Sequence, residues 1–221
     1  MTLPEYWLKR PEFDVEPHRD DFEAAFHVAV RAGDGKAPNA PTWAWLSWLC
    51  EARGLVAHGT GQGDISVFEP RQSNDTSWFG NRRAVYASSD ALWAMFFAIM
   101  NRPAVPMRIV NGAVGVRLEG KIEARYFFGV SGPALDQRAF RHGWVYLLPG
   151  VGFEREPDET SHGLVLESHH LASLEPVRPV FRVPVGPDDF PFRDRIHAYN
   201  SDVLESLVAR NPDGFPWIED L

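Results

Sequence analysis

The chain has 221 residues, 44% of them hydrophobic and 24% charged, a composition typical of a globular protein that buries a substantial core. Its formal net charge of -8 argues against a partner held mainly through a phosphate backbone, because such binding draws its affinity from clustered Lys and Arg. Nucleic acid is therefore not an expected partner. The single cysteine, Cys50, excludes an intramolecular disulfide and is expected as a buried thiol in a reducing, cytoplasmic setting.

The sequence indicates neither membrane insertion nor secretion. Its longest apolar run, residues 91–100, has about half of the ~20 residues that a membrane-spanning helix needs. The first residues, MTLPEYWLKRPEFD, lack the apolar core of a signal peptide. No Gly/Ser-rich or charged linker interrupts the chain, so its length predicts one main domain with an extension.

Two helices are predicted near the start of the chain. Over residues 20–32, apolar side chains recur at the i, i+3, i+4 spacing of one helical face, and Gly33 marks the end. Pro41 opens a second helix, whose tryptophans share a face and which ends at Gly54.

After Gly54 the pattern changes to short apolar runs bounded by Gly, Pro and Asn, which predict strands. The predicted strands are residues 55–58, 84–88, 107–110, 113–118, 125–130, 144–148, 164–167 and 180–185. The run 91–100 follows Ser89-Asp90, an N-cap signal, and is expected as a buried helix beneath the sheet. A capping pattern at residues 202–205, followed by an apolar stripe, predicts a C-terminal helix.

Helices first and then a run of strands predict an α+β fold with a largely antiparallel or mixed sheet. Residues 1–53 are expected to form an N-terminal helical extension, and residues 54–221 the α+β domain with its C-terminal helix. The series Gly59, Gly61 and Gly63 could suggest a dinucleotide-binding fold, but its spacing does not fit. The spacing G-x-G-x-x-G requires a glycine where Asp64 stands.

Motifs of several other enzyme classes are missing from the sequence. It contains no Gly-x-Ser-x-Gly elbow, no phosphate-binding P-loop and no His-Glu-x-x-His. His169 and His170 are adjacent, and neighbouring side chains on a strand point to opposite faces, so no metal site is expected. Nucleophilic hydrolases and metalloenzymes are therefore not favoured.

Two short motifs at predicted strand ends carry the functional hypothesis. The first is His58-Gly59-Thr60, and the second runs from Phe79-Gly80 to Val85-Tyr86-Ala87. Together they resemble the poly(ADP-ribose) polymerase and diphtheria-toxin branch of the ADP-ribosyltransferase superfamily. The resemblance implies an ADP-ribosyltransferase-like split sheet over about residues 54–185, and NAD as the bound dinucleotide.

The resemblance also implies roles for single residues. His58 and Thr60 orient ribose, and the backbone of Gly59 fixes the nicotinamide carboxamide, where a side chain would block close approach. Tyr86 and Phe97 sandwich the nicotinamide ring.

One serine of the family pattern is missing. It is expected three positions before Phe97, where Ala94 stands. The carboxamide then loses a hydrogen bond worth roughly 1 kcal/mol, or receives it from Ser88 or Ser89.

The third element of the family is a glutamate on a late strand, positioned at the ribose 2'-hydroxyl. A carboxylate suits this position because the transition state carries oxocarbenium-like charge on the sugar. Alignment with the family pattern places His162 at this position, with Glu159 and Glu167 nearby. If Glu167 points into the cleft, it steadies the ribosyl cation, and His58, Tyr86 and Glu167 form the catalytic set. If His162 points there instead, the site lacks its carboxylate.

Three functional hypotheses stay open. The first is transfer of ADP-ribose to an unknown acceptor such as a protein, or hydrolysis of NAD. The second is a catalytically degenerate module that binds a dinucleotide or a protein partner, which Ala94 and His162 favour. The third is RNA 2'-phosphotransfer with NAD as acceptor, against which the acidic charge counts. Arg82-Arg83 are candidates for holding the pyrophosphate of NAD beside the cleft, although paired arginines in a loop are commonly just solvated.

The same residues also have purely structural interpretations. A histidine before a glycine at a strand end is often a satisfied structural residue, and this applies to His58. Tyr86 in an apolar strand is most often packing, with its hydroxyl bonded at the edge. The aromatic residues Trp78, Phe79, Trp93, Phe96 and Phe97 are expected mostly in the core.

Overall fold

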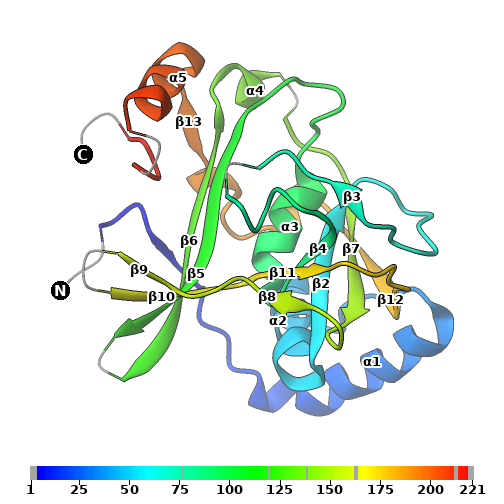
Figure 1. Ribbon diagram of the computed structural model, residues 1–221. Helices are drawn as coiled ribbons and strands as arrows, with labels where there is room; N and C mark the ends of the chain where they lie inside the picture. Colours follow the sequence, from blue (N-terminus) through cyan, green and yellow to red (C-terminus); the bar gives the residue numbers. More distant parts are fainter. Residues whose placement is uncertain are drawn as a thin grey trace.

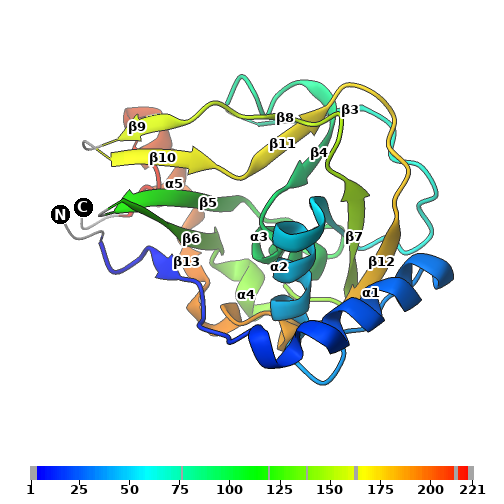
Figure 2. The ribbon, with the colours of Figure 1, turned by 90° about the horizontal axis from the view of Figure 1, so that it is seen from below.

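The computed structural model describes residues 4–75, 77–118, 120–137, 139–161, 164–211 and 214–218. Within them the fold is mixed α and β, with two largely antiparallel sheets and the buried helix α3 (Ala91–Ile99) between the sheets (Figures 1 and 2). The expected α+β class is confirmed at this level.

The first sheet lies on the left in Figure 1. Its strands, in spatial order, are β1 (Leu8–Lys9), β6 (Lys121–Ser131), β5 (Ile109–Leu118), β10 (Leu164–Ser168) and β9 (Glu159–Ser161). A further strand, β13 (His197–Tyr199), pairs with β6 in parallel.

The second sheet contains both predicted motifs. Its strands, in spatial order, are β12 (Phe181–Val185), β7 (Gly143–Pro149), β2 (Leu55–Thr60), β4 (Arg83–Ser88), β11 (His170–Ser173) and β8 (Glu154–Arg155). A short strand β3 (Arg71–Gln72) also pairs with β4. The first motif therefore ends β2, and the second lies on its neighbour β4.

The N-terminal helices form where the sequence predicts them. They are α1 (Arg19–Ala32) and α2 (Thr42–Arg53), and each ends at a glycine with positive φ, 74° at Gly33 and 61° at Gly54. Such a left-handed residue stops a helix at little steric cost only when it is glycine. Trp45 of α2 is fully buried and shares one core cluster with α3, so the packing continues without a gap across residue 54.

Helix α3 is buried on nearly every side, as its uniformly apolar sequence predicts. Asp90 caps it, because its carboxylate Oδ1 accepts a hydrogen bond of 3.1 Å from the backbone N–H of Trp93. Ser88 supports the cap in turn, since its hydroxyl accepts a 2.9 Å bond from the N–H of Asp90.

One continuous segment supplies a strand to each sheet, β10 to the first and β11 to the second. Residues 164–168 pair with β5 in the first sheet, and residues 170–173 pair with β4 in the second. Figure 2 shows the chain running from β10 directly into β11. His169 stands between the two strands, and its carbonyl accepts a 3.0 Å bond from the N–H of Ser89. Pairing on two sides fixes the path of this segment.

Three expectations differ from the structure in detail. The strands expected at 107–110 and 113–118 are one strand, β5, because the Asn-Gly step between them pairs along its whole length with β6 instead of turning. The C-terminal helix α5 (Ser201–Arg210) is capped by Asn200, whose side chain accepts bonds from two backbone N–H groups, and not by Asp202. Short elements such as β8, β9 and α4 (Pro133–Asp136) lacked a recognisable sequence signal.

The remaining described elements are short 3-10 turns at Glu16–His18, Pro187–Asp189 and Arg193–Arg195. None of the helices in the described ranges is both long and apolar enough to cross a bilayer.

Glycines of β2 and β7 set how closely α3 approaches the second sheet. A Cβ added at Gly143 would lie 2.1 Å from the carbonyl oxygen of Ala98. We expect Gly143→Ala to lower the free energy of unfolding by about 1–3 kcal/mol, because a backbone contact cannot rotate away. Urea denaturation of both proteins measures this difference.

The matched control is Gly112→Ala in β5. There the nearest atom to an added Cβ is the ring end of Phe215, at 3.1 Å, and that side chain is partly exposed and can shift. We expect a loss below about 1 kcal/mol. Equal losses in the two variants would contradict the role assigned to the contact with α3.

Candidate functional site

The two predicted motifs meet where β2 and β4 separate. The two strands are in register only at Ala57 and Ser88, whereas β2 stays paired with β7 as far as Thr60. The edge of β2 that faces β4 is therefore not paired with it from His58 onward. We call this break in the strand pairing the opening between β2 and β4. Across it, Nδ1 of His58 lies 2.6 Å from the carbonyl oxygen of Tyr86.

The hydrogen bond to Tyr86 also fixes the protonation of His58. A carbonyl oxygen only accepts, so Nδ1 carries the proton. Burial lowers the pKa of His58, a charge on Arg71 lowers it further, and the bond to Tyr86 only partly opposes them. The ring is therefore neutral near pH 7, and its Nε2 presents a lone pair that can accept a hydrogen bond. Phe68 packs against the ring at 4.6 Å between centroids.

Gly59 has a clear packing role in this strand. A Cβ at this position would lie 1.8 Å from the carbonyl oxygen of Ala94 and 2.9 Å from the backbone nitrogen of Ala98, both in α3. The α3-facing side of β2 at residue 59 is thus filled by helix backbone. Thr60 ends the strand, and its hydroxyl oxygen accepts a 3.3 Å bond from the N–H of Gln62.

Tyr86 offers its ring but not its hydroxyl. The hydroxyl donates to the carbonyl of Phe79 at 2.9 Å and accepts from the N–H of Arg82 at 2.8 Å. The half-buried ring lies against His170, 5.0 Å away between centroids and tilted by 33°. A planar ligand can therefore use Tyr86 only by stacking on it.

Phe97 is not in ring contact with Tyr86. The contacts run instead from Tyr86 to His170, from His170 to Trp93 at 5.2 Å, and from Trp93 to Phe97 at 6.2 Å. The two rings expected to sandwich nicotinamide are thus joined by a band of aromatic side chains between them. A ligand ring between Tyr86 and Phe97 requires His170 or Trp93 to move.

Glu167 lies on the side of the first sheet that faces α3. Its cross-strand partner is Gly115, which shares a strand face with Asn111, and the Asn111 side chain accepts a hydrogen bond from the indole N–H of Trp93. The Glu167 side chain therefore lies on the α3-facing side of the sheet.

The charge of Glu167 is already compensated. Its side chain, 16% exposed, forms an ion pair with Arg117 and a second one, at 3.7 Å, with Arg155. Arg155 also pairs with Asp158 at 3.1 Å, so two arginines and two carboxylates form a charge-balanced group here. His162, the alternative third element, lies outside the described residues.

A second carboxylate, Glu156, lies next to the aromatic band and was not found from the sequence. Its Oε2 accepts a 2.7 Å bond from the hydroxyl of Ser168 and lies 3.5 Å from Nδ1 of His170. Burial alone would raise the pKa of Glu156, but the hydrogen bonds from His170, Ser168 and Ser77 outweigh it and the pKa is lowered. The residue stands in a loop before a proline, and no periodic signal marks it.

The serines considered as substitutes for the missing family serine are both engaged. The Ser88 hydroxyl supports the α3 cap, and the Ser89 hydroxyl lies 3.0 Å from Nδ1 of His169. Both hydroxyls are therefore already hydrogen-bonded to groups outside the opening between β2 and β4.

The paired arginines of the second motif are likewise used locally. Arg82 forms an ion pair of 2.9 Å with Glu154 and lies over the ring of Phe79 at 4.2 Å. Arg83 donates through Nε to the carbonyl of Pro70 at 3.2 Å. These bonds hold both side chains to their own neighbourhood.

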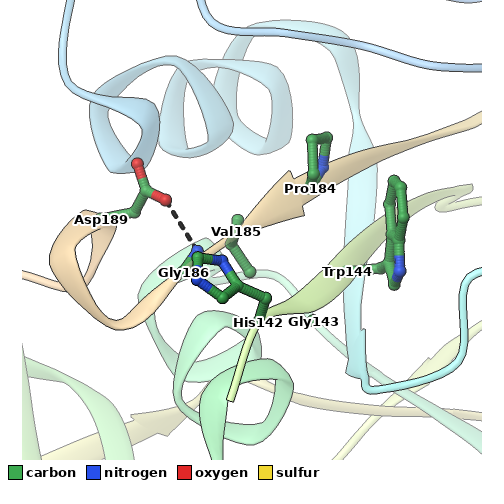
Figure 3. A pocket seen from close by; sticks show the side chains of 7 residues that line it. All are labelled: His142, Gly143, Trp144, Pro184, Val185, Gly186 and Asp189. Atoms are coloured by element: carbon green, nitrogen blue, oxygen red, sulfur yellow. Dashed lines mark hydrogen bonds between the residues drawn. The ribbon is translucent and has the colours of Figure 1, made fainter. Parts of the chain in front are cut away.

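A hollow of about 260 Å³ lies at the far edge of the second sheet (Figure 3). Asp189 supports its wall by accepting bonds of 2.7 Å from the N–H of Gly186 and from the hydroxyl of Thr42. It is lined by His142, Gly143, Trp144, Pro184, Val185, Gly186 and Asp189. None of the residues expected from the resemblance belongs to this hollow.

Comparison of the chain with models of protein families, with curated proteins and with solved structures found no match. Within the described part of the chain, no group of three or more His, Cys, Asp or Glu side chains is placed to hold a metal ion. Cys50 is buried in α2 and burial raises the pKa of its thiol, so it is a neutral packing residue.

The neutral state of His58 predicts a pH dependence of stability. Because its pKa is lowered in the folded state, the unfolded chain binds a proton below about pH 6.5 that the folded chain does not. Its contribution to stability is present above that pH and is lost as the pH falls. We expect His58→Asn, which does not titrate, to make the free energy of unfolding fall less steeply between about pH 7.5 and pH 5.5.

Urea denaturation of both proteins across this range measures the two slopes. Only the slopes are compared, so a uniform loss of stability in the variant does not affect the result. Identical slopes would show that His58 does not resist protonation.

Proposed function

We propose that this chain binds NAD at the opening between β2 and β4 and cleaves the bond between nicotinamide and ribose, passing ADP-ribose to an acceptor or to water. The observation that carries the proposal is the 2.6 Å contact between His58 and the Tyr86 carbonyl. It joins the two motifs that resemble the ADP-ribosyltransferase superfamily, at a place where the edges of two strands separate.

The chemistry of the two side chains suits a nucleotide. Neutral His58 presents Nε2 as an acceptor, and ribose hydroxyls are donors of the right kind. Tyr86 presents a ring whose hydroxyl is already bonded, and the nicotinamide ring is a planar partner for stacking. Binding by these groups fixes the glycosidic bond in place while the ring departs.

The cleavage step needs a negative charge near the sugar, because the transition state has oxocarbenium character. The resemblance assigns this role to Glu167, which is held between Arg117 and Arg155. Glu156 is the other carboxylate near the aromatic band, and its lowered pKa keeps it ionised. Glu167 and Glu156 are therefore both candidates for supplying this charge, and substituting each one separately shows which of them does so.

Binding without cleavage is the second candidate function. Two observations favour it: the charge of Glu167 is compensated by arginines, and Ala94, which replaces the expected serine, packs its backbone against Gly59. In this case the opening between β2 and β4 recognises a dinucleotide but does not break it.

The binding step is tested by calorimetry with NAD. We expect His58→Ala to lose measurable binding, and Tyr86→Ala to weaken it about tenfold or more through the lost ring face. Tyr86→Phe is the matched control, because it keeps the ring and removes only the committed hydroxyl. If the unchanged protein does not bind NAD, the proposal is wrong.

The cleavage step is tested by release of nicotinamide from NAD. We expect the carboxylate that steadies the ribosyl cation to be revealed by a fall in kcat of about 100-fold or more, in Glu167→Gln or in Glu156→Gln, with little change in NAD affinity. Binding by the unchanged protein with no nicotinamide release would establish the second candidate function instead.

A further inference from the structure

Arg141 occupies an unusual position at the end of α3. It directly precedes His142 and strand β7, and its backbone N–H donates a 2.8 Å bond to the carbonyl of Ile99. Its side-chain Nε donates a 3.3 Å bond to the carbonyl of Ala98. These two bonds hold the guanidinium group against the C-terminus of the helix and leave both Nη groups without a hydrogen-bond partner among the described residues.

Gly61 makes room for this guanidinium group. A Cβ at Gly61 would lie 2.1 Å from Cζ of Arg141, and 2.3 Å from Nη1. Any side chain at residue 61 would therefore displace the arginine. Gly61 directly follows Thr60, the last residue of β2 and of the first motif. Arg141 therefore contacts the chain one residue beyond this motif, on the side of the strand that Gly59 turns toward α3.

Arg141 also lacks a compensating negative charge. No carboxylate of the described chain forms an ion pair with Arg141 or with Arg102, and the same holds for some other arginines, such as the exposed Arg178, whereas many arginines are paired. The paired examples are Arg82 with Glu154, Arg117 with Glu167, and Arg182 with Asp34.

Arg102 and Arg141 flank the isolated bridge between Met100 and Phe140. Burial, and next the positive charge of Arg102, lower the pKa of Arg141. A guanidinium group remains charged under these conditions, so the lowered pKa marks an unfavourable environment for a cation. An anion bound beside both groups relieves that cost.

We propose that Arg141, assisted by Arg102, forms an anion site that holds the diphosphate of a dinucleotide. This inference rests on the proposed function and deepens it. The planar guanidinium presents Nη1 and Nη2 to two oxygens of a phosphate, which is the geometry of bidentate phosphate recognition. The site takes the place of the expected one at Arg82-Arg83, whose side chains are bonded elsewhere.

The ligand chemistry is tested with three probes, measured by calorimetry at low salt. NAD carries the diphosphate, nicotinamide riboside lacks any phosphate, and inorganic pyrophosphate carries nothing else. We expect Arg141→Gln to weaken NAD and pyrophosphate at least tenfold and to leave the affinity for nicotinamide riboside unchanged. Arg102→Gln, which changes an exposed side chain, should weaken NAD about threefold.

The matched control is Arg178→Gln, which removes the same charge from an exposed position and should change no affinity by more than about twofold. Arg141→Lys keeps the charge but not the fork, so we expect an affinity for NAD between those of the unchanged protein and Arg141→Gln. Unchanged circular dichroism spectra show that each variant is folded.

The outcomes separate this inference from the proposed function. If the unchanged protein and folded Arg141→Gln bind NAD equally, the anion site is wrong and NAD binding stands. If pyrophosphate binds through Arg141 but NAD does not bind, the anion site stands and the NAD proposal is wrong. If neither NAD nor pyrophosphate binds the unchanged protein, both are wrong.

Discussion

The close approach of the α3 backbone to the second sheet is the constraint on which the rest of the structure depends. Two glycines, Gly59 in β2 and Gly143 in β7, face carbonyl oxygens of the helix at distances that exclude a Cβ. The same approach carries α3 into the space between the sheets (Figure 1). Buried residues of α3 share one hydrophobic core cluster with residues of both sheets. The proposed site lies on the same strand, because β2 packs against the helix at Gly59 and is no longer paired with β4 beyond Ala57.

A buried carboxylate ties this helix to the rest of the chain. Asp90 is 2% exposed, and it caps α3, accepts a 2.7 Å bond from the hydroxyl of Tyr126 in β6, and lies 3.6 Å from Arg10. A buried charge is tolerated only when such partners surround it. The N-terminal segment, the first sheet and the central helix therefore depend on one another, although they are far apart in the sequence.

Local signals predicted much of the fold and little of the site. Gly33, Gly54 and Asp90 each act within a few residues, so the helix ends were visible in the sequence. The path of β10 into β11 depends on partners in two sheets, and the positions of Glu156 and Arg141 depend on loops whose course is set by distant packing. His58 and Tyr86 were singled out by two short motifs, but the hydrogen bond between them depends on where β2 and β4 separate, which no local pattern shows.

The direct passage of the chain from β10 in one sheet to β11 in the other has a mechanical consequence. The two sheets cannot swing apart like the domains of a hinged enzyme, because the segment around His169 is pinned on both sides by pairing with β5 and β4. Whatever enters between Tyr86 and Phe97 must be admitted by rotation of side chains, above all His170 and Trp93. Side-chain rotation within the aromatic band therefore controls access to this space, while strand pairing holds the surrounding backbone.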